Sequence, residues 1–420
     1  MSRTEVQNVA RCRACPGTDL ITFLSLGHLP LPDALLTREQ LTEPEPRFPT
    51  DVAFCPKCSL VQLLADVPRE VMFVDNYRYY SSFSDQLLAH SRDHVRGLVR
   101  DRHLDGGSLV IEIASNDGYL LSHLVEAGVP VLGIDPAPGP AQAARDAGVP
   151  TLERLFGREL AAELIVEGRR ADVIVANNVM AHVPDLEDFV GGIADLLADD
   201  GVVKVENPSV QYLIEQVEFD TIYHEHVCYY SCTSVERLMR LHGLYLNDVE
   251  EFLDLHGGTL RWTISRQSGR SERLEAKLAD EHARGMLDLA YYSGFASRVT
   301  RLRDELHSLI RDLRAQGHSI AAYGAAAKGT VLLNHVGLGA DLIDFVVDRN
   351  THKHGRFMPG VHIPIVGTEA LVTHQPDDVL LLAWNFADEI AMQQRAYLER
   401  GGRFIRPVPA PQFIYAPTVA

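Results

Sequence analysis

Two stretches of the sequence repeat one pattern, in which a short apolar run is followed by a turn of small residues, an amphipathic helix and another apolar run. The first contains SLVIEIASNDG, VPVLGID, ADVIVANNV and GVVKVENP, and the second contains HSIAAYGAAAKG, LIDFVVDRN, HIPIVG and DVLLLAWN. This alternation predicts two parallel sheets covered by helices on both faces. Residues 85–102 predict an amphipathic helix ahead of the first unit, and residues 270–316 predict long helices between the two units.

The N-terminal 75 residues lack helical periodicity and hold two CxxC pairs, Cys12 with Cys15 and Cys55 with Cys58. Two such pairs can close a tetrahedral shell of thiolates around zinc and leave no open position for a substrate. Unrelated thiols or a redox-active pair are the alternatives, but Pro16 and Pro56 favour tight knuckles over a helix start. We therefore expect a structural zinc.

These patterns together predict an α/β protein in three parts. They are a small zinc-binding lobe (1–75), a Rossmann-like domain (76–255) and a second C-terminal Rossmann-like α/β domain (256–420). The formal charge of -18 argues against nucleic acid or an anionic membrane as a partner. Because there is neither an apolar signal core nor an apolar run near ~20 residues, we expect a cytoplasmic protein. A monomer is the expected oligomeric state.

The turn after the first predicted strand contains acidic and small residues and matches neither GxGxxG nor a P-loop. Glu112 and Asp117 suit a cationic amino acid group, and Asp135 at the end of the next strand suits ribose hydroxyls. An acidic turn with a ribose-binding aspartate predicts S-adenosylmethionine as cofactor, whereas the alternative is a loop whose carboxylates cap helices. The predicted cofactor contacts are Glu112, Ala114, Asn116, Asp117, Gly118, Tyr119, Asp135 and Asn178.

The second unit offers a site for a diphosphate. Gly324, Ala325, Ala326 and Ala327 precede a predicted helix, and Lys328 adds a positive charge. The segment VDRNTHKHGR adds Arg349, Lys353, His354 and Arg356. Close packing with a solvated Lys328 is the alternative. The turn lacks the dinucleotide glycine pattern, which argues against an NAD-dependent oxidoreductase. Trp384 and Asn385 are candidates for contacting a base.

The segment FDTIYHEHVCYYS concentrates titratable side chains. In an extended strand His224 and His226 would share one side, with Tyr223 and Glu225 on the other. A tight turn would instead gather Tyr223, Glu225 and His226. A metal site fits poorly because HEH lacks the HExxH spacing, and a buried hydrogen-bonded network is a further alternative. We interpret Cys228 and Cys232 as small buried hydrophobes.

The chain resembles the nucleotide-deoxysugar C-methyltransferases over essentially its whole length. The resemblance is carried by CRACP, FCPKC, EIASNDGYLL, NNVMAHVPDL, FDTIYHEHVCYYS, HGGTLR, YGAAAKGTVLLN and VDRNTHKHGRFMPG. It implies S-adenosylmethionine-dependent methylation at C-3 of a dTDP-linked 4-keto-(2,)6-deoxyhexose, in deoxysugar biosynthesis for a bacterial natural product. C-5 methylation, or an O- or N-methyltransferase of the same fold, is the alternative. A non-catalytic adaptor is disfavoured by the cofactor turn and the YHEH segment.

The resemblance also implies roles for individual residues. Carbon methylation needs a base against a C–H and donors facing the C-4 oxygen. His226 is the expected base, since a neutral imidazole with a pKa of about 6.5 is available near neutral pH. Glu225 is expected to orient it or to bind a sugar hydroxyl. Tyr223 and His182 are candidates for hydrogen bonds to the C-4 oxygen or for positioning the sugar. The predicted substrate contacts are Tyr77, Tyr79, Lys328, Asn334, Arg349, Lys353 and Asn385.

One position departs from the family pattern. Ala114 stands where many methyltransferases place glycine. We expect no loss of cofactor binding, on the assumption that the backbone there does not need a positive φ.

Overall fold

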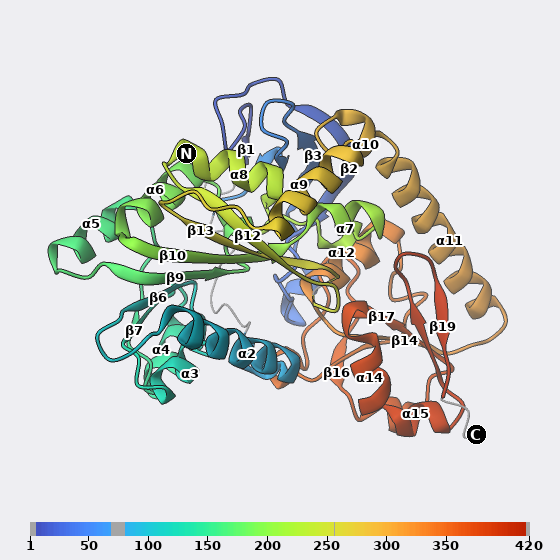
Figure 1. Ribbon diagram of the computed structural model, residues 1–420. Helices are drawn as coiled ribbons and strands as arrows, with labels where there is room; N and C mark the ends of the chain where they lie inside the picture. Colours follow the sequence, from blue (N-terminus) through green and yellow to red (C-terminus); the bar gives the residue numbers. More distant parts are fainter. Residues whose placement is uncertain (1–5, 69–79, 256, 417–420) are drawn as a thin grey trace.

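The computed structural model of the protein describes residues 6–68, 80–255 and 257–416. Three large sheets organise the chain, and helices surround the second and third of them (Figure 1). The predicted class is confirmed: an α/β protein with a small N-terminal lobe and two Rossmann-like domains. None of the helices in these ranges combines the length and the apolar composition that crossing a bilayer requires.

The N-terminal lobe is an antiparallel sheet in the order β11-β4-β3-β2. Three of its strands belong to the lobe itself: β2 (Ile21–Pro30), β3 (Arg47–Phe54) and β4 (Val61–Leu63). The fourth strand, β11 (Cys228–Tyr229), comes from the YHEH segment. A short pair, β1 (Gln7–Asn8) and β5 (Ala65–Asp66), and the 3-10 helix η1 (Glu39–Thr42) complete the lobe. The sheet of the N-terminal lobe therefore includes a strand from a much later part of the sequence.

The middle sheet has seven strands in the order β12-β13-β10-β9-β6-β7-β8. The strands from β10 to β8 are parallel, and β13 and β12 add an antiparallel edge. The strands are β6 (Val110–Ile113), β7 (Val131–Ile134), β8 (Thr151–Leu152), β9 (Ala171–Asn177), β10 (Leu197–Pro208), β12 (Tyr245–Phe252) and β13 (Thr259–Ser265). The helices of this part are α2 (Asp85–Arg102), α3 (Leu121–Glu126), α4 (Pro138–Asp146), α5 (Arg158–Val166), α6 (Leu186–Leu196), α7 (Val210–Glu215), α8 (Cys232–Leu241) and α9 (Glu272–Ala283).

The predicted boundary after residue 255 falls inside the β12–β13 hairpin. Because β13 pairs with both β10 and β12, the middle sheet continues to Ser265. The order in which the chain adds strands reverses between β6 and β9. These two strands are parallel, hydrogen-bonded neighbours, although β7 and β8 separate them in sequence. In a doubly wound sheet this switch point, at the carboxyl ends of the strands, is where ligands bind.

The C-terminal sheet has the order β16-β15-β14-β17-β18-β19, parallel except for β19. Its strands are β14 (Ile320–Tyr323), β15 (Val346–Asp348), β16 (Ile365–Gly367), β17 (Asp378–Leu381), β18 (Arg403–Arg406) and β19 (Gln412–Ile414). The helices are α10 (Leu289–Ser293), α11 (Phe295–Ala315), α12 (Ala327–Val336), α13 (Ala370–His374), α14 (Ala387–Gln393) and α15 (Arg395–Glu399). Helix α11 buries Val299, Leu302, Leu306, Ile310 and Leu313, the spacing of a single apolar face.

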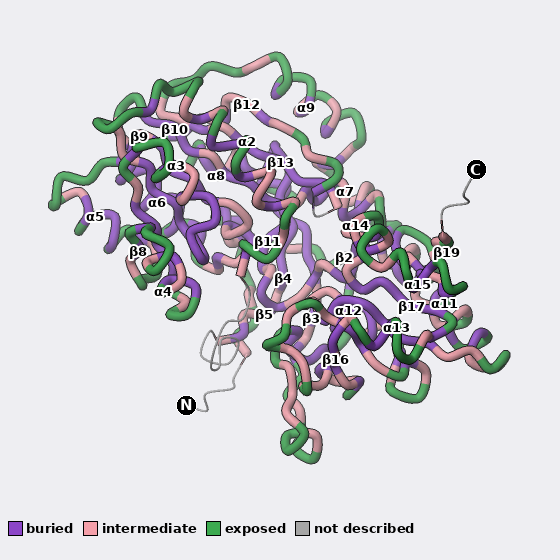
Figure 2. Tube along the Cα trace, turned by 90° about the horizontal axis from the view of Figure 1, so that it is seen from below, coloured by how far each residue is buried: buried purple, intermediate pink, exposed green. Residues whose placement is uncertain are grey.

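One hydrophobic core joins the first and third parts of the chain. It includes Val52 of β3, Phe219 of the 3-10 helix η4 (Phe219–Thr221) and Ile320 of β14. Buried segments run through the sheets, with exposed residues on the outer helices and loops (Figure 2). The segment around Phe219 therefore lies where the N-terminal lobe, the middle domain and the C-terminal domain meet.

The two α/β units share a local arrangement. In the middle domain, Asp135 follows β7 and accepts hydrogen bonds from the backbone N–H groups of Asn116 (2.9 Å) and Ala137 (2.8 Å). In the C-terminal domain, Asp348 ends β15 and accepts from the N–H groups of Ala325 and Asn350, both at 2.7 Å. In each unit one carboxylate thus ties the turn after the first strand to the loop after the second.

Candidate active site

The four predicted zinc ligands come together in the N-terminal lobe. The sulfur atoms of Cys12, Cys15, Cys55 and Cys58 all lie within 4.8 Å of one another, with Cys12–Cys58 at 3.4 Å and Cys15–Cys55 at 3.7 Å. A tetrahedral Zn–S distance of about 2.3 Å requires sulfurs about 3.8 Å apart, so the cluster has the right size for zinc. Among the described residues, this is the group arranged to hold a metal ion. The zinc is structural, because four thiolates fill its coordination shell.

The zinc-binding lobe is joined directly to the YHEH segment. The strand β4 follows the Cys55–Cys58 knuckle and pairs with β11, and the N–H of Leu63 donates to the carbonyl of Val227 at 3.0 Å. In the other CxxC pair, Arg13 lies between Cys12 and Cys15 and donates to the carbonyl of Pro184 at 3.2 Å. The metal site therefore supports both segments that carry the predicted catalytic histidines.

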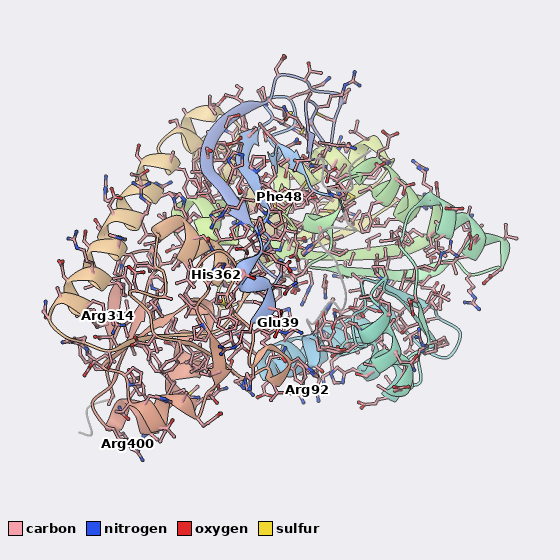
Figure 3. All side chains as sticks on the ribbon, turned by 180° about the vertical axis from the view of Figure 1, so that it is seen from behind. Glu39, Phe48, Arg92, Arg314, His362 and Arg400 are labelled. Carbon is pink, nitrogen blue, oxygen red and sulfur yellow. The ribbon has the colours of Figure 1, made fainter. Side chains whose placement is uncertain are left out.

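The YHEH segment forms a tight turn, as the second sequence interpretation required. The N–H of His226 donates to the carbonyl of Tyr223 at 2.8 Å. This turn separates the two histidines, and His224 points into the N-terminal lobe. Its Nε2 lies 3.2 Å from the carbonyl oxygen of Phe48 and 3.3 Å from Oγ1 of Thr50. Burial lowers the pKa of His224 to about 4, which makes it a neutral anchor. Figure 3 shows Phe48 where the lobe lies between the other two parts.

The hydrogen bonds of His226 define its tautomer. Its Nδ1 lies 3.0 Å from the carbonyl oxygen of Thr221 and must donate, because a carbonyl only accepts. In the neutral imidazole Nε2 then carries the lone pair, and it lies 2.9 Å from the hydroxyl of Tyr223, which donates to it. The Tyr223 and His226 rings are also stacked, with centroids 4.1 Å apart. This is the arrangement of a neutral base oriented through its second nitrogen.

His182 packs edge-on against His226, with ring centroids 4.7 Å apart. It ends the 3-10 helix η3 (Met180–His182), which follows β9. Burial lowers the pKa of His182 to about 4, opposed by a hydrogen bond to the backbone of Glu225. Near neutral pH His182 is therefore an uncharged imidazole, which has one N–H to donate.

The Glu225 carboxyl is buried, and its pKa is raised well above the ordinary value, mainly by desolvation and then by the negative charge of Asp33. Burial therefore favours the protonated form of Glu225. Asp33 belongs to the N-terminal lobe. Desolvation raises the pKa of Asp33, the charge of Lys353 lowers it and that of Asp348 raises it. Asp33 therefore lies within electrostatic reach of both the YHEH turn and the basic loop of the C-terminal domain.

The predicted cofactor residues gather at the switch point of the middle sheet. Glu112 is buried in β6, and its pKa is raised well above the ordinary value by burial and by the neighbouring charges of Asp135 and Asp117. Asn178 follows β9, and its N–H donates to the carbonyl of Glu206 at 2.6 Å. Tyr119 packs among the apolar residues beneath the turn.

The assumption about Ala114 is wrong. Its φ is 59°, and Asn116 and Gly118 also have positive φ, at 49° and 77°. The turn needs this backbone because the N–H groups of Ala114 and Ser115 both donate to the carbonyl of Ile134. Alanine can adopt the left-handed region, at a cost of roughly 1–2 kcal/mol that glycine does not incur.

The turn fits an S-adenosylmethionine site. Within the described ranges, four buried polar atoms around it have no hydrogen-bond partner: Oε2 of Glu112, Oγ of Ser115, Oδ1 of Asp117 and Oδ1 of Asn178. Three of these are acceptors only, which suits a ligand with an ammonium group and ribose hydroxyls. Two other acceptors of the turn have partners in η2 (Ser81–Phe83). The N–H of Ser81 donates to Oδ1 of Asn116, and the N–H of Ser82 donates to Oδ2 of Asp117.

The predicted substrate residues of the C-terminal domain have protein partners. Lys328 donates to Oδ1 of Asn385, and Lys353 donates to the carbonyl of Ala325 at 2.8 Å. Arg349 is half-exposed and lies 3.5 Å from Glu389. The amide of Asn334 donates to the carbonyls of Thr330 and Pro359, both at 2.9 Å. Tyr77 and Tyr79 lie outside the described residues, so their predicted roles remain predictions.

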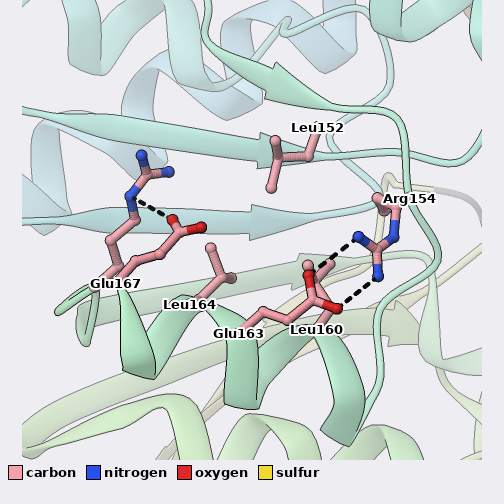
Figure 4. A pocket seen from close by; sticks show the side chains of 7 residues that line it. Leu152, Arg154, Leu160, Glu163, Leu164 and Glu167 are labelled. Atoms are coloured by element: carbon pink, nitrogen blue, oxygen red, sulfur yellow. Dashed lines mark hydrogen bonds and ion pairs between the residues drawn. The ribbon is translucent and has the colours of Figure 1, made fainter.

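Two hollows lie outside this constellation. One, of about 250 Å³, lies between β8 and α5 and is bordered by the Arg154–Glu163 and Arg169–Glu167 ion pairs (Figure 4). It contains none of the predicted site residues. The other, of about 390 Å³, is bordered by Arg38, His354, Arg356 and Phe357. Arg38 comes from the N-terminal lobe, and no sequence motif distinguished it or Asp33.

Comparisons with protein-family models match three segments of the chain. A zinc binding domain matches residues 12–73, a methyltransferase domain residues 86–249 and a C-methyltransferase C-terminal domain residues 254–409. Among curated proteins, the chain is 37% identical over 414 residues to the C-methyltransferase NovU of Streptomyces niveus, an alignment that covers 98% of each chain. A ubiquinone biosynthesis O-methyltransferase of Methylobacterium sp. (strain 4-46) is 33% identical over 122 residues, 27% of this chain and 47% of that protein.

Solved structures that resemble the chain cover less than half of it in the following two cases. The PH0226 protein of Pyrococcus horikoshii OT3 is 13% identical, with a TM-score of 0.37, over 46% of this chain and 97% of that one. Magnesium protoporphyrin IX methyltransferase from Synechocystis PCC 6803 with bound SAM is 16% identical, with a TM-score of 0.34, over 47% and 89%.

Proposed function

Since the chain belongs to the S-adenosylmethionine-dependent C-methyltransferases with an N-terminal zinc domain, we propose that it methylates C-3 of a dTDP-linked 4-keto-(2,)6-deoxyhexose. The enzyme's cofactors are S-adenosylmethionine and a structural zinc ion. When bound, S-adenosylmethionine supplies an electrophilic methyl group. The residues of this chain must then generate a nucleophilic carbon, through an enolate formed when His226 removes the proton from C-3.

One observation carries this proposal. The Nδ1–H of His226 is held by the carbonyl of Thr221, which leaves Nε2 as the basic nitrogen, and the neutral ring of His182 lies beside it. The Tyr223 hydroxyl, 2.9 Å from this nitrogen, supplies a neutral donor, and a base with a neutral donor beside it is what enolate formation next to a ketone requires. A transfer to oxygen or nitrogen needs no carbon acid and no such pair.

Tyr223, His182 and Glu225 would stabilise the enolate and hold the sugar. Substrate that reaches Nε2 of His226 must displace the Tyr223 hydroxyl from it, and this frees the hydroxyl to donate to the C-4 oxygen. His182 is neutral because its pKa lies near 4, and its one N–H is already donated to the backbone of Glu225. Its other ring nitrogen can accept a hydrogen bond from a sugar hydroxyl and so position the sugar. Burial raises the pKa of Glu225 and so favours its protonated form, which could donate to a sugar hydroxyl.

The C-terminal domain would bind the nucleotide. The Asp348 arrangement matches that of Asp135, which supports a nucleoside-binding role for this crevice. Lys353 and Arg349 flank it, and we propose that they contact the diphosphate, together with Lys328 of the adjacent helix. Asn334 and Asn385 stay predicted contacts. The hollow bordered by Arg38 and Arg356 extends the positive charge available to an anionic substrate.

A dTDP-sugar is a water-soluble metabolite, which favours a cytoplasmic enzyme, and we propose a monomer. The substrate places the pathway in deoxysugar biosynthesis for a bacterial natural product. The alternative site of methylation is C-5, which also lies beside the C-4 ketone.

Deuterium exchange tests the proposal. The enzyme is incubated in D2O with dTDP-4-keto-2,6-dideoxyglucose and S-adenosylhomocysteine, so that the enolate forms but is not methylated. We expect deuterium at C-3, and no exchange with His226→Asn. NMR of the product formed with S-adenosylmethionine then locates the methyl group. Deuterium and methyl at C-5 would replace the C-3 assignment, and methylation without carbon exchange would contradict the enolate mechanism.

A further inference from the structure

The residue next to Thr221 is a fully buried carboxylate with partners from another domain. Asp220 lies in η4, directly before the residue whose carbonyl holds Nδ1 of His226 at 3.0 Å. Its Oδ2 accepts a hydrogen bond from Nε1 of Trp384 at 2.7 Å. Trp384 begins the 3-10 helix η6 (Trp384–Phe386), which follows β17 of the C-terminal sheet. A 164-residue separation in sequence is thus closed by one short bond.

A lysine of the same domain completes the cluster. Nζ of Lys328 lies 4.4 Å from the centre of the Trp384 ring, and its charge acts on the carboxyls of both Asp220 and Glu218. Burial raises the pKa of Asp220 to about 6, while Lys328 and the Trp384 hydrogen bond hold it down. Asp220 is therefore ionised near neutral pH although it is buried. An isolated buried charge would be costly, so these partners are needed to keep it there.

Apolar contacts hold the same short helix against the C-terminal domain. The ring of Phe219 lies 5.2 Å from that of His335 in α12, and Phe219 is fully buried in the shared core. On its other side the chain continues through Thr221 into the YHEH turn. The position of the Thr221 carbonyl is therefore fixed by the C-terminal domain on one side and by His226 on the other.

We propose that Asp220 is a positioning residue for the base, and that Trp384 and Lys328 act through it to orient His226. The inference rests on the proposed role of His226. The carboxylate does not touch substrate or cofactor. It anchors the turn whose carbonyl selects the Nδ1–H tautomer, so a shift of this anchor moves or rotates the lone pair on Nε2. The domain proposed to bind the nucleotide thus also sets the geometry of proton removal.

Trp384→Phe tests the anchor with a small change. It keeps a large aromatic ring for Lys328 but removes the N–H donated to Asp220. Misplacement of a catalytic group by about 1 Å can cost about 100-fold in rate. We therefore expect kcat to fall between about 10-fold and 100-fold, with the KM for S-adenosylmethionine unchanged. Deuterium exchange at the substrate carbon should fall by the same factor.

Trp262→Phe is the matched control, because the chain contains two tryptophans and both are buried. Trp262 also donates from Nε1, to the sulfur of Cys232 at 3.3 Å, within the middle domain. Its replacement should lower Tm and leave kcat within about twofold of the parent enzyme. Equal losses of kcat in the two variants, or an unchanged kcat in Trp384→Phe, would overturn the inference.

Two substitutions of Asp220 distinguish the loss of its hydrogen bond from a general loss of packing. Asp220→Asn keeps an oxygen that can accept from Trp384, whereas Asp220→Ala keeps none. We expect the asparagine variant to retain at least tenfold more kcat than the alanine variant at matched Tm. Equal activities would count against positioning through this bond. His226→Asn is measured alongside: if it stays active, the proposed base is wrong, and if only it is inactive, the role of Asp220 is wrong.

Discussion

The hydroxyl of Tyr223 lies 2.9 Å from Nε2 of His226. In the proposed mechanism this is the nitrogen that takes a proton from carbon, because Nδ1 already donates to the Thr221 carbonyl. The Tyr223 hydroxyl therefore covers the proposed base, and the substrate has to displace it. The two side chains come from one turn of four residues, so a single local movement can uncover the base and redirect the donor.

Tyr223→Phe should lower kcat about 100-fold, since loss of one oxyanion donor typically costs 100- to 1,000-fold. Deuterium exchange should fall with methyl transfer, because the same enolate precedes both. Tyr397→Phe is the control: the Tyr397 hydroxyl donates to the carbonyl of Arg403 at 3.1 Å, within the C-terminal domain and away from the YHEH turn. Its removal should leave kcat unchanged. A fully active Tyr223→Phe enzyme would remove Tyr223 from the oxyanion role.

Loss of zinc should disturb the YHEH turn as well as the lobe. In Cys55→Ser the tetrahedral shell is incomplete, and we expect zinc content to fall and the β4–β11 pairing to loosen. Faster hydrogen exchange at the amide of Leu63, which donates to Val227, reports this directly. Cys232→Ala is the control: it removes a thiol outside the cluster, and this variant should bind as much zinc as the parent protein. A well-folded Cys55→Ser protein with unchanged exchange at Leu63 would contradict the structural role.

Local patterns allowed much of the fold to be predicted. The alternation of apolar runs and helices identified both α/β units because each strand and helix carries its own periodicity. The cysteine spacing identified the zinc cluster for the same reason. The edge strands β18 and β19 had no such signal and were missed, as was the extension of the middle sheet by β13.

Contacts between parts of the chain could not be predicted in this way. No local pattern marks Asp220 as the partner of Trp384, or β11 as the fourth strand of the zinc lobe, because these pairings depend on how the three parts pack. The φ of Ala114 was missed for a related reason, since its hydrogen bond to Ile134 comes from the neighbouring strand. The YHEH residues suggested a site, but only the turn separates His224 from His226.

Ala114→Gly should stabilise the protein. Glycine removes the cost of roughly 1–2 kcal/mol that alanine incurs in the left-handed region. Glycine also makes the unfolded chain more flexible, which lowers the free energy of unfolding by about 0.4–1 kcal/mol. We therefore expect a net gain of about 0.5–1 kcal/mol in the free energy of unfolding, measured by urea denaturation. The affinity for S-adenosylmethionine should not change, because the backbone path is the same. Ala137→Gly, at a residue with a negative φ, should destabilise instead.

The stability of the protein should depend on pH through Asp220. Its pKa is about 6 in the folded state and 3.8 ordinarily, so the folded state binds its proton more tightly than the unfolded state. The contribution of Asp220 to the free energy of unfolding is fully present below pH 3.8 and is lost as the pH rises through 6. The difference between the two pKa values corresponds to about 3 kcal/mol. Asp220→Asn has no such titration, so its free energy of unfolding relative to the parent should rise by up to about 3 kcal/mol between pH 4 and pH 7. Urea denaturation of both proteins across this range measures the combined effect of Asp220 and of the two groups whose pKa values its charge raises, Glu218 and Lys328. Parallel curves would mean that Asp220 is not buried as a charge near neutral pH, and the proposed anchoring by Lys328 would lose its physical basis.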